Sequence, residues 1–321
     1  MTLSAPSSTQ PAWESFAAAC LGCIEYEATL PELGRDVPVL ASLCWKEHGH
    51  CTLSRPSWGI SEHRNQSLLH PTNPSTNHQS QRLSNILSHT LSLSPAVDII
   101  FLQELSHEAF QFRLKSQRFA GSLTTITLLS KARFHQRPNP GPVWRVKHLT
   151  RFGRDALCCD VFAANNSASI SPDAPGTRLR LVNVHLESLP IQPSLQPQQV
   201  AAAAALLRSA GRGVVAGDFN PVLPADETLV RGNGLVDAWA ELRPGEPGYT
   251  WGADGKEPFP PNRMDKAAAV GLQWQDVEVL SPGYISCWAD PVGEGNGDDQ
   301  DQVVPWSDHS GLKCSFKLAG L

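Results

Sequence analysis

Two short segments of the chain place oxygen-bearing side chains directly after a run of apolar residues. Glu104 follows Phe101-Leu-Gln, and Asp218 and Asn220 follow Val214-Val-Ala-Gly. A carboxylate at the mouth of a buried strand can hold a hard cation, although any strand must end in something polar. Residues i and i+2 of an extended segment point the same way, so Asp218 and Asn220 can converge on one water molecule. The alternative for this pair is an Asx turn, which both residue types favour.

A third segment alternates between apolar and polar residues. In Arg178–Leu186 and the residues just after it, Val182 and Val184 face one way, whereas Asn183, His185 and Glu187 face the other. We expect the second set to lie on one face, where it could meet a phosphate. A lone histidine on a strand is also commonly a structural residue whose hydrogen bonds are satisfied locally.

The fourth segment is Trp306-Ser-Asp308-His309-Ser310, at the entry to an amphipathic strand. An acid, an imidazole and a hydroxyl together suggest a catalytic triad, but consecutive strand side chains point to opposite faces and cannot form one. An imidazole beside an acid fits instead a histidine that contacts phosphate near a metal ion.

The elements that must position these residues are strands mixed with helices, without strict βαβ alternation. Apolar periodicity predicts two helices, at 81–93 and 198–210, with Pro197 and Gly211 bounding the second. Predicted strands cover 37–43, 97–102, 122–129, 156–162, 178–186, 214–217, 277–280 and 312–318. This pattern predicts an α/β (α+β) fold with two packed sheets and outer helices.

Composition sets further bounds. The chain has 321 residues, 41% hydrophobic residues and a formal net charge of −5, which argues against a protein that coats DNA in general. It contains no apolar run long enough for a membrane span, and its first residues lack the features of a signal peptide. We therefore expect no membrane association, an intracellular protein (nuclear or cytoplasmic) and a monomer.

Although the whole chain has a negative net charge, one segment is strongly basic. Residues 109–154 contain no Asp or Glu, and they hold ten of the 26 basic residues. These are Arg113, Lys115, Arg118, Lys131, Arg133, Arg137, Arg145, Lys147, Arg151 and Arg154. The segment is either a solvated face balanced by acids elsewhere or a basic wall beside a cleft that holds a polyanion.

The eight cysteines are too dilute for a disulfide scaffold. Cys20 and Cys23 have metal-ligand spacing, and Cys44 and Cys51 follow with two histidines between them, so a four-ligand zinc site competes with free thiols. Cys158 and Cys159 lie in an apolar run, and we expect them in the core.

In order, IIFLQEL, VNVHLES, GDFN, RMD and WSDHSGL resemble the endonuclease/exonuclease/phosphatase superfamily, over 98–316. The strings His-Leu-Glu-Ser at 185–188, Gly-Arg-Asp-Ala-Leu at 153–157 and Tyr249-Thr-Trp251 before Arg263-Met-Asp265 are most similar to its five-prime tyrosyl-DNA phosphodiesterase branch. The resemblance implies a four-layer αββα sandwich with two central mixed sheets. It implies a catalytic domain at 37–321 after a lead-in at 1–36 that is partly helical or flexible, with a disordered insertion at 46–80.

The resemblance also implies roles for individual residues. Glu104 and Asp308 would serve a Mg²⁺ ion, with Mn²⁺ as the alternative. Asp218 would deprotonate the attacking water, Asn220 would position it, and His309, steered by Asp265, would contact the phosphoryl oxygen. His185 and Ser188 would bind the phosphate, and Trp251 and Arg154 the rest of the substrate.

Two positions depart from the family pattern. The asparagine that ends the first core strand is replaced by Cys44 or Gly59, depending on which run is that strand, and Val222 replaces an arginine after the GDFN string. The implied activity is Mg²⁺-dependent hydrolysis of a phosphodiester, by in-line attack of an Asp-activated water. Nucleic-acid ends are favoured over inositol phosphates or phospholipids as substrates. The alternatives are a weakened member that binds nucleic acid or phosphorylated ligands without turnover, and an unrelated globular protein.

Overall fold

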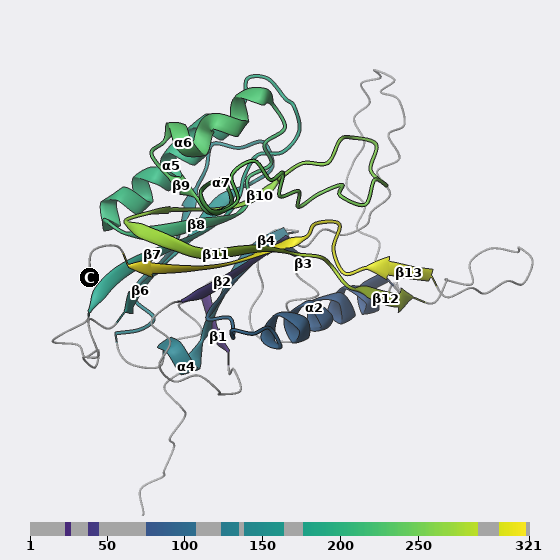
Figure 1. Cartoon of the computed structure of the whole chain (residues 1–321), viewed down its shortest axis with the longest axis horizontal. Helices are drawn as coiled ribbons and strands as arrows, with labels where there is room; N and C mark the ends of the chain where they lie inside the picture. Colours follow the sequence, from purple (N-terminus) through teal and green to yellow (C-terminus); the bar gives the residue numbers. More distant parts are fainter. Residues whose placement is uncertain are drawn as a thin grey trace, which may run out of the picture.

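The structure is a computed structural model, and it describes residues 23–26, 38–44, 75–106, 123–134, 138–163, 176–287 and 302–318. Two large sheets make up its centre (Figure 1). The strands of the first sheet are β1 (Cys23–Tyr26), β2 (Val39–Cys44), β3 (Ile99–Ser106), β4 (Leu123–Ser130), β11 (Leu272–Leu280) and β14 (Gly311–Leu318). Those of the second are β5 (Val143–Lys147), β6 (Asp155–Ala163), β7 (Thr177–His185), β8 (Gly213–Asp218), β9 (Val236–Asp237) and β10 (Asp265–Val270).

Helices and one hairpin complete the described elements. The helices are α2 (Ser75–Leu91), α4 (Lys131–Phe134), α5 (Gln196–Ala210), α6 (Leu229–Gly232) and α7 (Ala238–Leu242), with a 3₁₀ turn η1 (Pro224–Thr228). The hairpin joins β12 (Tyr284–Cys287) to β13 (Gln302–Pro305) and lies beside α2 (Figure 1).

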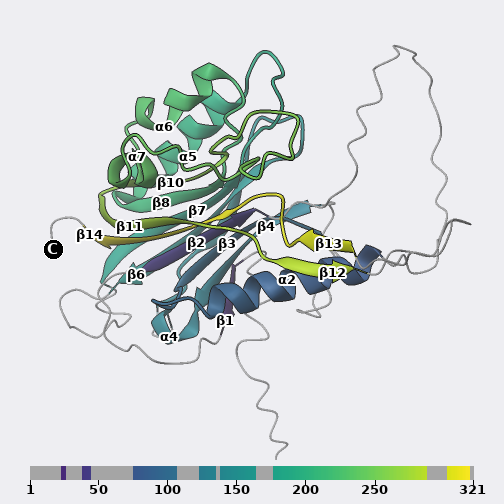
Figure 2. The ribbon, with the colours of Figure 1, turned by 45° about the vertical axis from the view of Figure 1, so that its right-hand side comes forward.

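Both sheets are mixed. The first has the order β1-β4-β3-β2-β14-β11, in which β1 with β4 and β2 with β3 are parallel pairs. The second has the order β5-β6-β7-β8-β10-β9, in which only β7 and β8 run parallel. The two sheets stack face to face, as Figure 2 shows, with helices above and below. The predicted α/β sandwich of two mixed sheets between helices is confirmed.

Three apolar layers hold this stack together. Ile99 and Phe101 of β3 meet Leu181 of β7 between the sheets. Outside the first sheet, residues of α2 such as Ile86 pack on Ile100, which points the opposite way from its neighbours. Burying such large side chains contributes about 1.5–3 kcal/mol each, so the alternation along each strand fixes which face carries polar groups.

Local sequence accounts for the outer layer on the second sheet. Helix α5 has Pro197 in its first turn, and Gly211 ends it with a φ of 80°, a left-handed conformation that glycine adopts without strain. Val182 and Val184 of β7 pack under this helix with Leu207. The predicted helix and the predicted alternation of β7 are both confirmed.

Two predicted boundaries change. Helix α2 begins at Ser75 rather than at residue 81, so the last six residues of the predicted 46–80 loop are helical, and the part up to residue 74 lies outside the described residues. Strand β1 comes from the predicted lead-in and pairs with β4. The rest of the lead-in, expected to be partly helical or flexible, lies outside the described residues.

The backbone register of the first sheet separates Cys23 from Cys44, two of the four cysteines of the zinc alternative, whereas Cys20 and Cys51 lie outside the described residues. Cys23 pairs with Thr127, and Cys44 pairs with Gln103, with β4 and β3 between the two cysteine-bearing strands. Three strand spacings are roughly 14 Å, whereas two ligands of one zinc ion reach it over bonds of about 2.3 Å. Cys23 and Cys44 therefore cannot share the ion. Cys158 and Cys159 are buried in the core, as predicted.

Within the described ranges no helix is both long and apolar enough to cross a membrane.

Candidate active site

Three ionisable residues form one row across the second sheet. His185 at the end of β7 is in register with Asp218 at the end of β8, and Asp218 is in register with Asp265 at the start of β10. Side chains in register on neighbouring strands point to the same face. The row is 0–4% exposed, so three titratable groups from distant parts of the sequence share a buried edge.

Gly217 lets two of these strands approach each other. Its φ is 139°, and a Cβ placed there would lie 1.9 Å from the carbonyl oxygen of Val184. Any other residue would clash with backbone that cannot move without breaking the β7–β8 pairing. A glycine is therefore required directly before Asp218.

One end of the row is a histidine–aspartate pair. His309 Nδ1 lies 2.8 Å from Asp265 Oδ2, and both side chains are buried. Burial alone would lower the pKa of the His309 imidazole, but the charge and hydrogen bond of Asp265, together with the charges of Asp218 and Asp308, raise that pKa to about 10. His309 is therefore an imidazolium at neutral pH.

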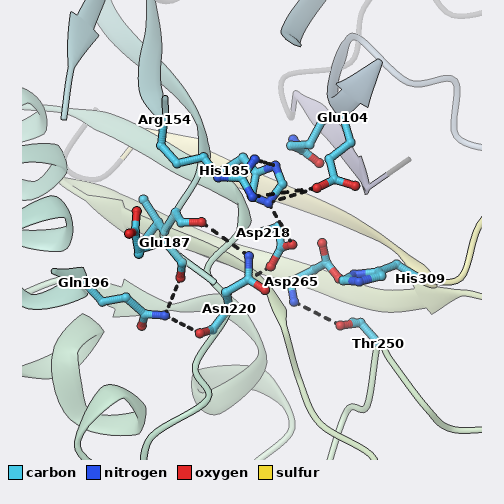
Figure 3. A network of polar contacts seen from close by, with 12 residues as sticks. Glu104, Arg154, His185, Glu187, Gln196, Asp218, Asn220, Thr250, Asp265 and His309 are labelled. Atoms are coloured by element: carbon cyan, nitrogen blue, oxygen red, sulfur yellow. Dashed lines mark hydrogen bonds and ion pairs between the residues drawn. The ribbon is translucent and has the colours of Figure 1, made fainter. Parts of the chain in front are cut away.

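Thr250 holds this pair from behind. Its hydroxyl accepts a hydrogen bond of 2.9 Å from the Asp265 backbone N–H, and its carbonyl accepts one of 2.7 Å from Ser310 N–H. Because Ser310 follows His309 directly, one buried threonine fixes both members of the pair (Figure 3).

Asp218 lies between this pair and His185. Burial raises the pKa of its carboxyl to about 7; Asp265 and Glu104 raise it too, whereas His309 opposes them. The backbone N–H of Asn220 donates to Asp218 Oδ1 over 2.9 Å. The φ of Asn220 is 46°, a left-handed conformation uncommon outside glycine and consistent with a functional turn.

Glu104 approaches from the other sheet. It lies inside β3, not after it, at an irregularity where the pairing with β4 shifts between Leu102 and Leu105. Its φ of 57° turns the carboxylate inward, with Oε1 3.4 Å from His185 Nε2. The carboxylate therefore reaches the buried row of His185, Asp218 and Asp265 because of a bulge inside the strand, and not because the strand ends there.

Arg154 fixes the protonation of His185. One guanidinium nitrogen lies 2.9 Å from His185 Nδ1, and another lies 3.8 Å from Glu104 Oε1. Because a guanidinium only donates hydrogen bonds, Nδ1 must accept. The ring is then neutral with its proton on Nε2, which faces Glu104 and, at 3.5 Å, Asp218 Oδ2 (Figure 3).

The donor set fits a divalent cation. Carboxylate oxygens of Asp218 and Asp265 lie within 4.8 Å of one another. His309 lies beside them, but as an imidazolium it has no lone pair to offer an ion. The carboxylate of Glu104 lies on the same side of the sheet, 3.4 Å from His185 Nε2. Asp265 Oδ1 is buried and accepts no hydrogen bond from the described residues. Converging carboxylates with mutual repulsion are the ligands that hard cations such as Mg²⁺ prefer.

Other predicted site residues lie nearby with different contacts. The backbone of Trp251 bridges to that of His309, which places this half-buried tryptophan beside the cluster. Asp308 precedes His309 and acts on its pKa. Ser188 is half-buried, and within the described residues no hydrogen bond or ion pair joins it to the cluster.

Two residues expected to face a phosphate do not face the site. Asn183 is fully buried and bridges the sheets: its Oδ1 accepts from Gln103 Nε2 at 2.7 Å, and its Nδ2 donates to the Ile126 carbonyl at 2.9 Å. Glu187 lies beyond the end of β7, where the chain bends, and it bonds to the loop at 150–151. The alternation of side chains between the two faces of a sheet holds only within the strand, and β7 ends at His185.

Sequence reasoning missed several supporting residues. Thr250 directly precedes Trp251, which the family resemblance identified, and no local sequence pattern distinguishes this threonine. Gln196 opens α5, and its amide donates to the carbonyls of Glu187 and Asn220. A buried glutamine in a first helical turn, next to Pro197, is a signal that could have identified it.

The basic segment does not form one wall within the described residues. Lys131 and Arg133 follow β4, at the end of the sheet opposite Glu104. Arg145 pairs with Asp155 at 2.7 Å, and Arg151 lies 3.4 Å from a Glu187 oxygen. In the described part of this segment, Arg154 is the basic residue that contacts the site.

Fold and site together define a class of protein. A model of the Endonuclease/Exonuclease/phosphatase family matches residues 58–309, well over half of the chain. The chain belongs to this family and is a metal-dependent hydrolase of the phosphodiesterase type. No curated protein is similar enough in sequence to match it.

Among solved structures, the chain is similar to TDP2 from D. rerio, crystallised with a single-strand DNA product, at 19% identity and a TM-score of 0.57, covering 88% of this chain and 100% of that one. TDP2 from C. elegans matches at 17% identity and a TM-score of 0.56, over 88% and 75%. A Bacteroides thetaiotaomicron family member matches at 10% identity and a TM-score of 0.56, over 89% and 99%. At these identities the likeness establishes the fold.

Proposed function

We propose that the chain hydrolyses a phosphodiester at a nucleic-acid end, by in-line attack of a water molecule that Asp218 activates with the help of Mg²⁺. The observation that carries this proposal is the position of Asp218, buried between a neutral histidine and a cationic one. A general base works best when its pKa lies near the operating pH. The pKa of about 7 for Asp218 meets that condition.

The residues divide the chemical work. Asp218 accepts a proton from the attacking water. The oxygen of that water forms a bond to phosphorus while the bond from phosphorus to the leaving oxygen breaks. Asn220, fixed through its backbone N–H and by Gln196, positions the water. His309 donates from Nε2 to a non-bridging oxygen, and Asp265 on Nδ1 keeps it protonated and oriented.

The remaining residues bind. Glu104 and Asp308 would hold Mg²⁺, or Mn²⁺ in its place. When bound, the ion neutralises charge on the phosphate oxygens as a Lewis acid. His185 offers Nε2–H to the phosphate, and Ser188, Arg154 and Trp251 contact the rest of the substrate.

Two observations favour a nucleic-acid end over a small head group. Arg154 contacts His185 and Glu104, and Arg151 stands on the same loop with a partly exposed guanidinium, so this loop could follow a phosphate backbone. The similar D. rerio protein was crystallised with a single-strand DNA product. For an enzyme that acts on nucleic-acid ends, we expect a nuclear or cytoplasmic location, and we expect the protein to be a monomer.

The test is cleavage of a five-prime tyrosyl oligonucleotide, with bis(p-nitrophenyl) phosphate as the small phosphodiester for comparison. We expect Mg²⁺-dependent turnover that favours the oligonucleotide and disappears in Asp218→Asn and Glu104→Ala. Asp160→Asn, which disturbs an ion pair with Arg180 on the same sheet, is the matched control and retains turnover below its melting temperature. Equal turnover in EDTA would contradict the metal requirement.

A second candidate is a member that binds phosphorylated or nucleic-acid ligands without turnover. The observation that favours it is Cys44, which ends β2 beside Gln103, next to Glu104, where the family resemblance expects asparagine. A thiol is a poorer ligand for a hard cation than an amide oxygen. Calorimetry separates the candidates: retained oligonucleotide binding with no Mg²⁺ binding supports the second, and Cys44→Asn should then gain Mg²⁺ affinity.

A further inference from the structure

Glu187 is a buried acid that the proposed chemistry does not use. It lies two residues beyond His185 and is 3% exposed. Its carboxylate accepts from the Thr150 hydroxyl at 2.7 Å and from the Arg151 backbone N–H at 3.0 Å. The guanidinium of Arg151 approaches it only to 3.4 Å and is 31% exposed, so the ion pair is the weaker part of this contact.

Thr150 relays this contact to Arg154. Its hydroxyl gives its hydrogen to Glu187 and accepts from two backbone N–H groups, those of Phe152 at 3.0 Å and Arg154 at 3.3 Å. A hydroxyl has one donor and two acceptor sites, so all three are filled. The turn from Thr150 to Arg154 is closed by this single side chain.

A second buried side chain fixes the same two segments. Gln199 of α5 accepts from the Glu187 backbone N–H at 2.8 Å and donates to the Leu149 carbonyl at 2.9 Å. The loop is therefore anchored to the extension of β7, the strand that carries His185. Anchor and target share one rigid element, so the loop cannot shift without breaking these bonds.

We propose that Glu187 is a positioning residue, which holds Arg154 against His185 and Glu104 through the hydroxyl of Thr150. Arg154 in turn holds the His185 ring by its Nδ1, so that Nε2 points toward Glu104 and Asp218. The proposal deepens the proposed function and rests on it for its effect on catalysis. A carboxylate suits the position because both of its partners donate, whereas a glutamine would turn an N–H₂ group toward one of them.

The first test compares matched variants in kcat/KM with the five-prime tyrosyl oligonucleotide. Thr150→Val keeps shape and loses the hydroxyl, Thr150→Ser keeps the hydroxyl, and Glu187→Gln changes only the anchor. We expect Thr150→Val and Glu187→Gln to lose up to about tenfold, the loss expected when Arg154 itself is removed, and Thr150→Ser to stay near wild type. In an Arg154→Ala background neither change should cost more. Full additivity in the double variants would overturn the proposal.

The second test does not depend on activity. Guanidinium ¹⁵N signals of Arg154, assigned with Arg154→Lys, report whether this side chain is held in one position. We expect a single set of signals in wild type and Thr150→Ser, and shifted or broadened signals in Glu187→Gln and Thr150→Val. Asp160→Asn, which breaks a buried pair remote from this loop, should lower the melting temperature and leave the Arg154 signals unchanged. Unchanged Arg154 signals in Thr150→Val would refute the positioning role, whereas lack of turnover by a wild-type protein with the expected signals would refute only the proposed function.

Discussion

Two buried histidines flank Asp218, and they differ in what bonds to Nδ1. His309 has the carboxylate of Asp265 there, at 2.8 Å. His185 has the guanidinium of Arg154 there, at 2.9 Å. The carboxylate makes the first ring a cation, and the guanidinium makes the second ring neutral.

The difference shows how one residue type serves two purposes in one site. Both rings present Nε2–H toward the mouth, but only His309 brings a positive charge with it. A cation beside Asp218 stabilises the negative charge that builds up on phosphate oxygens, whereas a second cation would lower the pKa of the base. The charge of each ring is therefore set by the group on its Nδ1, a carboxylate for His309 and a guanidinium for His185.

The largest effect is expected from removing the group between the two rings. Asp218→Asn deletes the base, and general-base catalysis contributes roughly 10²–10⁴-fold, so kcat should fall by about 10³-fold. Because burial disfavours the Asp218 carboxylate, the melting temperature should not fall. Steady-state kinetics and thermal unfolding measure both, and a variant with more than a tenth of wild-type kcat would show that another group is the base.

Asp265→Asn makes His309 resemble His185 in charge. Without the charge of Asp265, burial dominates and the pKa of His309 falls from about 10. The imidazolium is then lost at lower pH, so the alkaline limb of kcat/KM should move to lower pH, and kcat at neutral pH should drop by about 10²-fold. An unmoved alkaline limb would mean that His309 acts as a neutral ring.

Arg154→Ala releases the other ring. We expect about a tenfold loss in kcat/KM, because His185 can then place its proton on either nitrogen. Arg154→Lys keeps a charge and a donor but loses the planar fork that reaches both His185 and Glu104. It should fall between alanine and wild type in the same assay. Equal activity of all three proteins would remove Arg154 from the site.

The smallest effect is expected from Thr250→Val, which keeps shape and removes the acceptor for the Asp265 N–H. One neutral hydrogen bond contributes about 1 kcal/mol, so kcat should fall about fivefold. Thr250→Ser retains the hydroxyl and serves as the control. If both variants lose activity alike, packing of the methyl group, not the hydrogen bond, supports the pair.

Much of this arrangement was predictable from the sequence, and the limit is physical. Strict alternation around Val182 and Val184 fixes a strand and its buried face, and Gly217 before Asp218 signals a close approach. Register between strands is not local, so the row from His185 to Asp265 came from family resemblance rather than from spacing.

What escaped prediction has no local signature. Nothing in Phe101-Leu-Gln-Glu104 announces a bulge, because a left-handed glutamate depends on the neighbouring strand. The direction of Glu187 depends on where β7 ends and on a loop more than thirty positions earlier in the chain. Tertiary contacts determine the bulge at Glu104 and the direction of Glu187, whereas local sequence propensity determines only where helices and strands form.

The strand β1 has a practical meaning for anyone who shortens this protein. It pairs with the outer side of β4, at the margin of the first sheet. A chain that started at residue 37 would leave the N–H and C=O groups of β4 open along that margin, and such open edges recruit other chains into aggregates. Strand β1 thus protects this edge of the sheet against pairing with other chains.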